Sequence, residues 1–279
     1  MPTKILRLGF TECSLLFLYW LERELKGNPN IKFSKDQFTK WLYTTSGYYD
    51  KKQIGNYFNV IHGEDDPPIY KQYMETLYEF IRDADIFEYN FHQLPYKDRQ
   101  VDFKKELNVK KECEINQEVV FRFIEGKKVL VISPFADLII SQYYTGNVAR
   151  IFLNAPYIKK FVGYRFPYTF FNNGPHQNIL ETSDLIFHEI IQKYGTDYDS
   201  VLLSIGAYGC ILAKKFYDIG KDVCIVGGNF QAYFGIMNRR FQNRNNKFLN
   251  IQNRQYWIMK IPDEYKPDGY MSIEDGCYW

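Results

Sequence analysis

The second half of the chain alternates short apolar runs with helical patterns, and this alternation constrains the fold more than any other feature. Two apolar runs of strand length, 129–133 (VLVIS) and 201–206 (VLLSIG), are followed by helical patterns at 136–144 and 207–220, and a third run occupies 222–228 (DVCIVGG). Strands that alternate with helices of this length form right-handed crossovers and a parallel sheet. The sequence therefore predicts an α/β fold, a Rossmann-like parallel sheet with flanking helices.

The first residues of the chain repeat this order of strand and helix. Residues 4–8 (KILRL) predict a short strand that runs through Gly9 to Thr11. We expect Thr11 to cap an amphipathic helix over 12–26, because its hydroxyl can accept from a free N–H group of the first turn. Another helix is expected over 184–195, where apolar residues again recur at helical spacing.

Residues 28–125 have a mainly helical character. A capping box at 34–37 predicts one helix start, and apolar residues at helical spacing follow the two prolines at 67–68. The stretch 97–128 is rich in Lys and Glu and lacks strong apolar periodicity, which indicates a surface helix or a long connection. We expect residues 1–279 to form a single domain with this mainly helical segment as an insertion.

Composition and charge exclude several classes of protein. With 46% hydrophobic and 24% charged residues, the chain is neither disordered nor a disulfide miniprotein. The formal charge is only +2, so we expect no nucleic acid partner, because duplex binding needs a basic face. Five scattered cysteines without C-x-x-C spacing predict reduced thiols in a cytoplasmic protein. The longest early apolar run, 13–21, is too short to span a membrane.

Aromatic residues make up 18% of the chain, with 24 Tyr, 23 Phe and 4 Trp. Tyrosine-rich surfaces suit stacking on sugar rings or bases, and packing inside the core explains the same excess. Composition alone leaves both explanations open.

Ligands of open parallel sheets bind beyond the carboxyl ends of the strands, so the loops at those ends hold the candidate site residues. These loops are 9–12, 133–137, 206–209 and 227–231. Glycines in the sequence Gly-Ala-Tyr-Gly at 206–209 allow close approach of a phosphate to a helix start, and tight packing requires them equally well. The next strand ends in Val-Gly-Gly without the carboxylate that holds a ribose in dinucleotide and S-adenosylmethionine sites, which disfavours both classes.

A basic segment follows the last predicted strand. Between Asp222 and Asp263 there is no acidic residue, and arginines and lysines recur, among them Arg239 and Arg240. Guanidinium groups pair with phosphate oxygens, so the segment suits an anionic group such as a nucleoside diphosphate. The alternatives are a solvated basic loop and a strip that contacts RNA.

Two carboxylates follow predicted strands and are the candidate catalytic groups. Glu12 and Asp137 each lie in the first turn of an expected helix, where a negative charge also stabilises the helix dipole. Either could take a proton from an acceptor hydroxyl. Among the histidines, His176 lies in a polar loop and is a candidate for binding, His188 is expected to be structural, and His62 has acidic neighbours that would suit a cation.

Four segments together resemble a known family. They are LRLGFTECSLL near the start, KVLVISPFADLIISQY, SIGAYGCILAKKFYDIGKDVCIVGGNFQAYFGIMNRRF and the terminal IEDGCYW. They resemble polysaccharide glycosyltransferases of bacteria and large DNA viruses, including chlorovirus enzymes that decorate capsid glycans, of the GT-D type. The segments occur in order and cover most of the chain, with little contribution from 28–125.

The resemblance implies transfer of a sugar from a nucleoside diphosphate donor, commonly a uridine diphosphate (UDP) sugar, to a glycan hydroxyl in the cytoplasm, the host's if the protein is viral. Because the viral relatives build fucose-centred glycans with pentoses, xylose is the expected sugar and a fucose of a capsid N-glycan the expected acceptor. In GT-D enzymes the first strand ends in Asp-x-Glu, which handles donor and metal. Here the motif reads Phe10-Thr11-Glu12, so Glu12 is the one matching ligand for Mn²⁺ or Mg²⁺, and the metal becomes optional.

The resulting hypothesis is an inverting single displacement. Glu12 or Asp137 acts as base, while Thr11 and His176 bind the acceptor. The expected donor-binding residues come from three of the loops and the basic segment: Ser133, Phe135, Gly206, Ala207, Tyr208, Gly209, Gly228, Gln231, Arg239 and Arg240. The competing hypotheses are a glycan methyltransferase that uses S-adenosylmethionine and a glycan-binding protein without catalysis.

Overall fold

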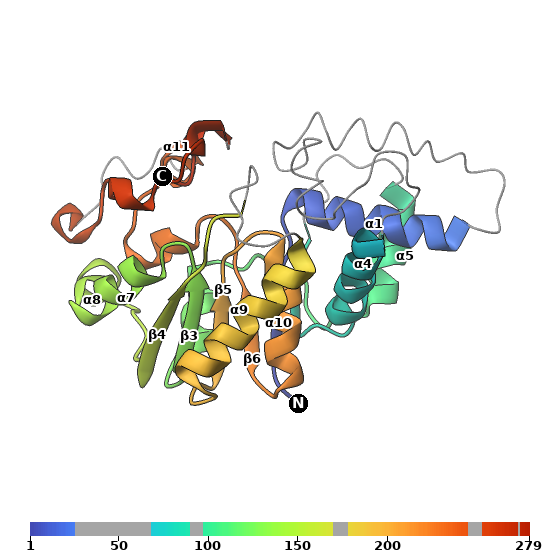
Figure 1. The fold of residues 1–279 in the computed structure, drawn as a ribbon, viewed down its shortest axis with the longest axis horizontal. Helices are drawn as coiled ribbons and strands as arrows, with labels where there is room; N and C mark the ends of the chain where they lie inside the picture. The colour runs from blue at the N-terminus through green and yellow to red at the C-terminus, as the bar shows by residue number, and fades with distance from the viewer. Residues whose placement is uncertain (26–67, 90–96, 170–177, 245–252, 273) are drawn as a thin grey trace.

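The computed structural model describes residues 1–25, 68–89, 97–169, 178–244, 253–272 and 274–279 (Figure 1). Its centre is a six-stranded sheet in the order β2-β1-β6-β5-β3-β4, in which every pair of neighbours is parallel. The strands are β1 (Lys4–Arg7), β2 (Ile86–Glu88), β3 (Lys128–Ser133), β4 (Lys160–Arg165), β5 (Ser200–Leu203) and β6 (Asp222–Ile225). This arrangement confirms the predicted α/β fold with a Rossmann-like parallel sheet.

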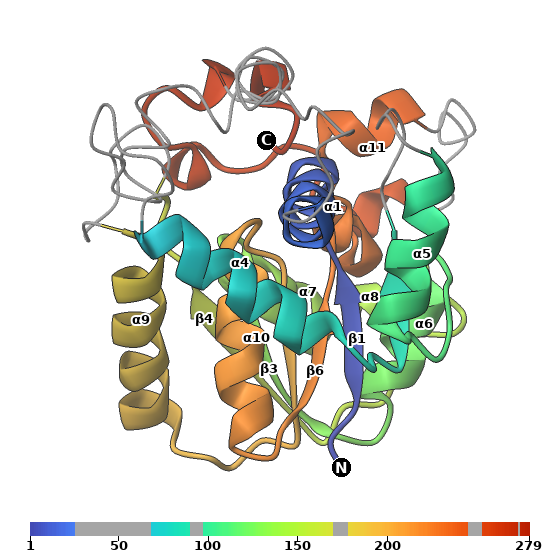
Figure 2. The same ribbon diagram turned by 90° about the vertical axis from the view of Figure 1, so that its right-hand side faces the viewer.

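Helices flank the sheet on both faces (Figure 2). The α-helices are α1 (Phe10–Leu25), α4 (Pro68–Ile81), α5 (Lys97–Leu107), α6 (Gln117–Ile124), α7 (Ala136–Tyr144), α8 (Asn147–Ile151), α9 (Ile179–Tyr194), α10 (Tyr208–Asp218) and α11 (Arg239–Arg244). Short 3₁₀ turns follow β6 and build the C-terminal part: η2 (Phe230–Phe234), η4 (Arg254–Tyr256), η5 (Asp263–Tyr265), η6 (Tyr270–Ser272) and η7 (Glu274–Gly276). None of the helices in these described ranges is long and apolar enough to cross a membrane.

Two apolar clusters form the core, one on each face of the sheet. Successive strand residues alternate between them: Leu130 and Ile132 pack with α1, α4, α9 and α10, while Val129 and Val131 pack with α6, α7 and η2. Side chains of a strand point alternately to opposite faces, so a strand covered by helices on both sides reads as a continuous apolar run. The run 129–133 has this character because β3 lies inside the sheet.

The direction of each crossover determines which helices cover which face. The chain passes from β4 to β5 and from β5 to β6 through α9 and α10 on one face, and from β3 to β4 in the opposite direction through α7 and α8 on the other. Right-handed crossovers require this separation. Neighbouring strands whose chains leave toward opposite faces open a crevice at their carboxyl ends. This occurs between β3 and β5 and between β1, which leads to α1, and β6, which leads to η2.

Several sequence predictions hold and others need correction. The helix predicted over 136–144 matches α7, and α10 lies within 207–220. The proposed cap at Thr11 is wrong, because α1 already begins at Phe10 and its first turn includes Thr11. Helix α9 begins at Ile179, earlier than predicted, because the side chain of Asn178 accepts hydrogen bonds from two N–H groups of its first turn.

The sequence did not predict β2 or β4, the two edge strands. Strand β2 comes from the segment expected to be a helical insertion, and it pairs with β1 in the main sheet. The stretch 97–128, expected at the surface or as a connection, supplies α5 and α6, and α6 buries Val120 and Phe121 in the core. The capping box predicted at 34–37 lies outside the described residues.

Candidate functional site

A cleft of about 400 Å³ lies at the carboxyl ends of β1, β2 and β6. It coincides with the crevice between β1 and β6, the type of place where ligands of open parallel sheets bind. Its lining residues come from strand ends and from loops far apart in the sequence: Arg7, Glu88, Tyr89, Glu112, Cys113, Glu114, Ile115, Gly227, Gly228, Asn229, Tyr233 and Arg240.

One arginine crosses the floor of this cleft. The guanidinium of Arg7, the last residue of β1, lies against Gly227 so closely that a methyl group added to this glycine would overlap it. Arg7 Nε donates to Glu88 Oε1 at 2.8 Å, and both side chains are largely buried, with 19% and 14% exposed. Glu88 Oε2 accepts from the backbone N–H of Ile115 at 2.7 Å. A carboxylate fixed by two donors therefore holds Arg7 in one orientation.

A second arginine reaches the next glycine from another element. Arg240, in α11, has its Nη1 atom 2.9 Å from the position of a methyl group added to Gly228. Asn238 fixes the start of α11 there, since its Oδ1 accepts from the N–H of Phe241 at 2.7 Å and its Nδ2 donates to the Gly228 carbonyl at 3.3 Å. Two guanidinium groups from different elements thus lie on two consecutive glycines.

Tyrosines and a buried amide complete the lining of the cleft. Burial raises the pKa of Tyr233 to about 12. Burial also raises the pKa of Tyr89, and the negative charge of Glu112 raises it further. Both phenols therefore stay neutral at physiological pH, and Tyr233 donates its hydroxyl to the Ile115 carbonyl at 3.3 Å. Within the described ranges the buried Oδ1 atom of Asn229, a residue of the cleft lining, has no hydrogen-bond partner.

The two predicted catalytic carboxylates lie far apart. Glu12 is buried in the first turn of α1, and its carboxylate lies over Gly9 at the end of β1. Asp137 is exposed in the first turn of α7, at the end of β3. Strands β6 and β5 separate β1 from β3, so these strand ends are roughly 14 Å apart at the usual strand spacing. One substrate position cannot use both carboxylates as its base.

The Glu12 carboxylate has an electrostatic effect on Cys210 of α10. Burial raises the pKa of the Cys210 thiol, and the nearby Glu12 carboxylate adds to the shift. Glu12 lies on α1, the helix that follows the strand carrying Arg7, and it is not among the residues that line the cleft.

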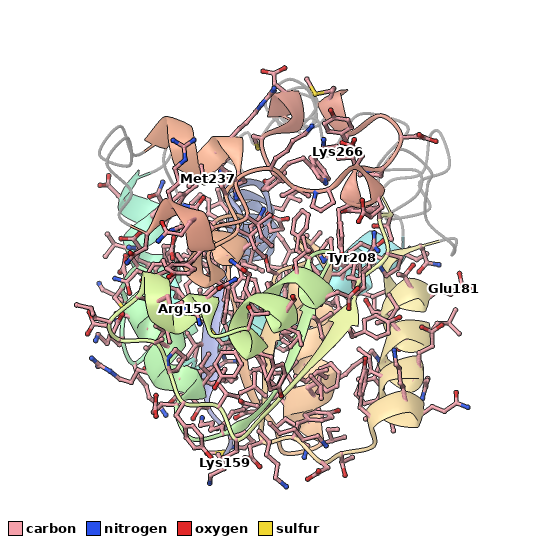
Figure 3. All side chains as sticks on the ribbon, turned by 90° about the vertical axis from the view of Figure 1, so that its left-hand side faces the viewer. Arg150, Lys159, Glu181, Tyr208, Met237 and Lys266 are labelled. Atoms are coloured by element: carbon pink, nitrogen blue, oxygen red, sulfur yellow. The ribbon has the colours of Figure 1, made fainter. Side chains whose placement is uncertain are left out.

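The glycine turn after β5, residues 206–209, makes contacts inside the protein and does not contribute to the cleft. Gly206 has a positive φ of 57°, and its carbonyl accepts from the Gly209 N–H at 2.9 Å. The Ala207 carbonyl accepts from the Tyr73 hydroxyl at 2.9 Å. Tyr208 lies inside the fold against Phe166, with ring centroids 5.1 Å apart (Figure 3). Only Gly206 of this turn is exposed, and no residue of the turn lines the cleft.

The other predicted donor residues also have structural roles. Ser133 is buried and its hydroxyl accepts from the Phe135 N–H at 3.2 Å, while the Phe135 ring packs on Tyr265 inside the core. Gln231 is buried and donates to a C-terminal carbonyl, as does Arg239. Of the predicted donor-binding residues, the cleft contains Gly228 and Arg240.

The two residues expected to bind the acceptor are Thr11 and His176. Thr11 lies in the first turn of α1, and His176 lies outside the described residues. No three His, Cys, Asp or Glu side chains converge into a metal site anywhere in the described ranges. The described residues around Glu12 therefore do not form a ligand set for the metal ion that the resemblance implies.

Sequence reasoning missed Arg7, Glu88 and Tyr278. Dinucleotide and S-adenosylmethionine sites have a carboxylate at the position where β6 ends, and this chain has none there. A carboxylate of the cleft, Glu88, lies at the end of β2. No sequence signal marked it, because β2 has three residues and its place beside β1 follows from the strand order. The tail residue Tyr278 reaches the cleft through its contact with Gly228.

The cleft has two guanidinium groups at its glycine end, and three carboxylates, Glu88, Glu112 and Glu114, line it as well. Guanidinium groups held on bare backbone match phosphate oxygens in charge and geometry.

A scan against protein-family models and searches of curated proteins and of solved structures gave no match for this chain.

Proposed function

We propose that the protein is a glycosyltransferase that moves a sugar from a nucleoside diphosphate donor to a hydroxyl of a glycan. The observation that carries the proposal is the pair of guanidinium groups, Arg7 and Arg240, on the consecutive glycines 227 and 228. Both arginines line the same cleft, and two guanidinium groups suit two linked phosphates. The cleft volume of about 400 Å³ lies within the range of small-molecule sites.

In the proposed reaction Glu12 takes the proton from the acceptor hydroxyl. The acceptor oxygen then forms a bond to the anomeric carbon, and the bond from that carbon to the diphosphate breaks with both electrons left on the diphosphate. Arg7 and Arg240 hold the charge that develops there, which is the largest contribution protein groups make in such reactions. We assign the base to Glu12 because its helix, α1, follows β1, the strand that carries Arg7. Asp137 belongs to α7, which follows β3, and β6 and β5 separate β3 from β1.

The sequence resemblance supports the choice of sugar transfer among reactions of nucleoside diphosphates. UDP-xylose is accordingly the first donor to test, with other UDP-sugars beside it. A metal ion has no part in this scheme, since the described residues form no site for one.

The experiment combines binding with turnover. Thermal shifts with UDP, S-adenosylmethionine and neutral glycans separate the three hypotheses, since a ligand at 100 times its dissociation constant stabilises by about 2.7 kcal/mol. We expect stabilisation by UDP, and release of UDP from one UDP-sugar in the presence of a fucoside. Glu12→Gln should abolish turnover with little loss of UDP affinity, and Asp137→Asn should leave both unchanged.

Arg7→Met and Arg240→Met should each weaken UDP at least tenfold. Arg165→Met is the matched control, because this arginine ends β4, donates to the Glu264 carbonyl at 2.8 Å and lies away from the cleft lining. Stabilisation by S-adenosylmethionine alone, or equal UDP affinity in all three arginine variants, would contradict the proposal.

A further inference from the structure

The C-terminal residues 275–279 are bound to the segment that follows β6. Three of their carbonyls accept hydrogen bonds from it: Asp275 from Arg239 Nη1 at 3.1 Å, Cys277 from the Arg240 N–H at 2.9 Å, and Tyr278 from Gln231 Nε2 at 2.9 Å. Figure 1 shows the C-terminus beside α11. The tail is therefore part of the wall around Gly228.

The side chain of Tyr278 makes direct contact with the proposed phosphate site. Its hydroxyl accepts from Arg240 Nη1 at 2.7 Å, and the Arg240 guanidinium carbon lies 5.5 Å from the ring centroid. A methyl group added to Gly228 would lie 2.5 Å from Tyr278 Cε1. Ring, guanidinium and glycine backbone thus meet at one point.

The Tyr278 ring is itself held from behind. The Trp279 ring lies 5.9 Å from it, and Trp279 Nε1 donates to the Tyr265 carbonyl at 2.7 Å. With its carbonyl fixed by the buried Gln231, Tyr278 has little freedom to move. A long arginine side chain loses less conformational freedom on binding when a rigid partner already holds it.

We infer that Tyr278 is a positioning residue that holds Arg240 across Gly228 for the second phosphate of a nucleoside diphosphate. The inference rests on the proposed function. Arg7 has Glu88 as its own fixed partner, so each guanidinium is held separately. Tyr278 consequently sets the preference for a diphosphate over a monophosphate and acts through Arg240.

The test compares UDP, uridine monophosphate (UMP) and inorganic pyrophosphate by titration calorimetry. Tyr278→Phe removes the hydroxyl that holds Arg240 and keeps the ring. We expect this variant to bind UDP and pyrophosphate about three- to tenfold more weakly while UMP affinity stays the same. Tyr270→Phe is the matched control, because its ring also contacts Trp279, at 5.6 Å between centroids, and no contact of it with Arg240 occurs among the described residues.

The same change in an Arg240→Met background should have no further effect on UDP. Equal weakening of UDP and UMP by Tyr278→Phe, an undiminished effect in that background, or tighter UDP binding would each overturn the inference. If the wild-type protein binds UDP and Tyr278→Phe has the same ratio of UDP affinity to UMP affinity, the inference about Tyr278 is wrong and the proposed function stands. If pyrophosphate binding depends on Tyr278 but no UDP-sugar releases UDP, the role of Tyr278 stands and the proposed glycosyltransferase function is wrong.

Discussion

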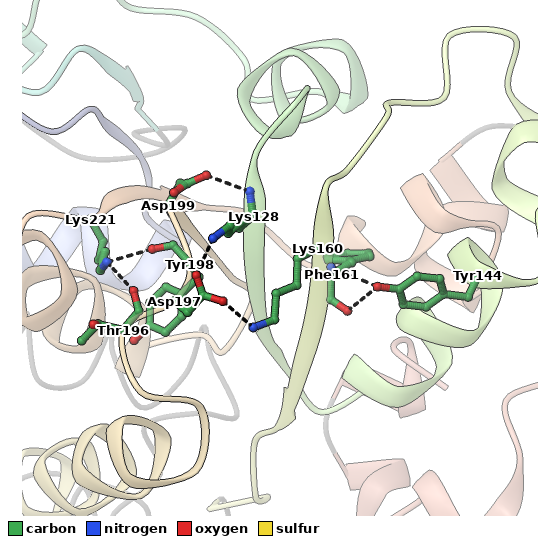
Figure 4. Close-up of polar contacts among 9 residues, drawn as sticks. All are labelled: Lys128, Tyr144, Lys160, Phe161, Thr196, Asp197, Tyr198, Asp199 and Lys221. Atoms are coloured by element: carbon green, nitrogen blue, oxygen red, sulfur yellow. Dashed lines mark hydrogen bonds and ion pairs between the residues drawn. The ribbon is translucent and has the colours of Figure 1, made fainter.

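The amino and carboxyl ends of the parallel sheet satisfy their charged groups in different ways. At the amino end, acidic and basic side chains pair with one another: Asp197 accepts from Lys128 at 2.5 Å and from Lys160 at 2.9 Å, and Asp199 accepts from the Lys128 N–H at 2.9 Å (Figure 4). Lys221 donates to two backbone carbonyls in the same region. These charged groups at the amino end bind to other groups of the protein.

At the carboxyl end the charged groups line a cavity. Arg7 and Arg240 lie on glycine backbone, and Glu114 is exposed at the cleft with no ion pair among the described residues. Figure 3 shows how far apart the two ends are, with Lys159 at one and Met237 and Lys266 at the other. The same strands thus lead to paired charges at one end and to the lining of a cleft at the other.

The difference follows from the crossovers. All six strands run in one direction, so every loop that leaves a strand does so at the same end. Where two neighbouring strands lead to opposite faces, no helix covers the gap between them. Substitutions at the amino end should therefore change stability and leave ligand binding intact, and the reverse should hold at the cleft.

The largest effect is expected for Lys4→Ala at the amino end. Lys4 Nζ donates to the carbonyls of Phe80 at 3.1 Å and Arg82 at 2.6 Å, and burial lowers its pKa. Loss of both donors leaves two carbonyls without partners, which should lower the free energy of unfolding by about 2–3 kcal/mol. Urea unfolding measures this loss, and UDP affinity should stay unchanged.

Lys4→Met separates the two contributions of this side chain. It keeps much of the apolar stem, so the loss should be smaller than for Lys4→Ala. A weakened UDP affinity in either variant would break the comparison between the two ends.

The second effect concerns the cleft. Gly227→Ala places a methyl group where the Arg7 guanidinium lies. Arg7 must move, so UDP affinity should fall about tenfold, which is about 1.4 kcal/mol, and crowding should reduce stability by about 1 kcal/mol. Calorimetry with UDP and urea unfolding measure the two changes.

Gly209→Ala is the matched glycine variant after β5. Its methyl group would meet Ile225 Cγ2 at 3.2 Å in the core, so stability alone should change. Equal losses of UDP affinity in the two glycine variants would show that the contact between Arg7 and Gly227 has no part in binding.

The strands that the sequence predicted are mostly those inside the sheet. Strands β3 (KVLVIS) and β5 (SVLL) each contain a continuous apolar run because helices cover both of their faces. Strands β2 and β4 are edge strands, and β4 (KFVGYR) mixes polar and apolar residues that fit no single pattern. Only pairing with a neighbour identifies such segments as strands.

The sequence predicted the cleft residues that directly follow a strand. It missed the residues that reach the cleft only because distant segments lie side by side in the fold. Gly228 and Arg240 follow β6 in a segment with a visible excess of basic residues. Glu88 belongs to the site because β2 pairs with β1, and Tyr278 because the tail returns to Gly228. These contacts join residues far apart in the chain, and no local spacing reports them.

A third effect concerns the open edge of the sheet at β4. The Tyr144 hydroxyl accepts from the Phe161 N–H and donates to its carbonyl, both at 3.1 Å, and Tyr194 donates to the Gly163 carbonyl at 2.5 Å. These phenols occupy the backbone groups with which another strand would pair. Part of the tyrosine excess therefore has a structural use that composition did not reveal.

Tyr144→Phe should expose this edge. We expect a loss of stability of about 0.5–1 kcal/mol and greater self-association in sedimentation velocity across a concentration series. Tyr157→Phe is the control, because this side chain is 64% exposed and its hydroxyl has no hydrogen bond to the described residues. Identical sedimentation of the two variants would show that the hydroxyl does not protect the edge.

The smallest effect is expected for the exposed Asp197, whose ion pairs are screened by solvent. Hydrogen bonds from Lys128 and Lys160 lower its pKa from 3.8 to about 2. A depressed pKa in the folded state stabilises the fold above the pKa of the unfolded chain, and this stabilisation disappears as the pH falls through the folded value. Asp197→Asn should therefore melt at a slightly lower temperature than the wild type near pH 6. The difference should vanish between about pH 4 and about pH 2. A difference that stays constant over this range would mean that the charge of Asp197, and hence its ion pairs with Lys128 and Lys160, is not what stabilises the amino end.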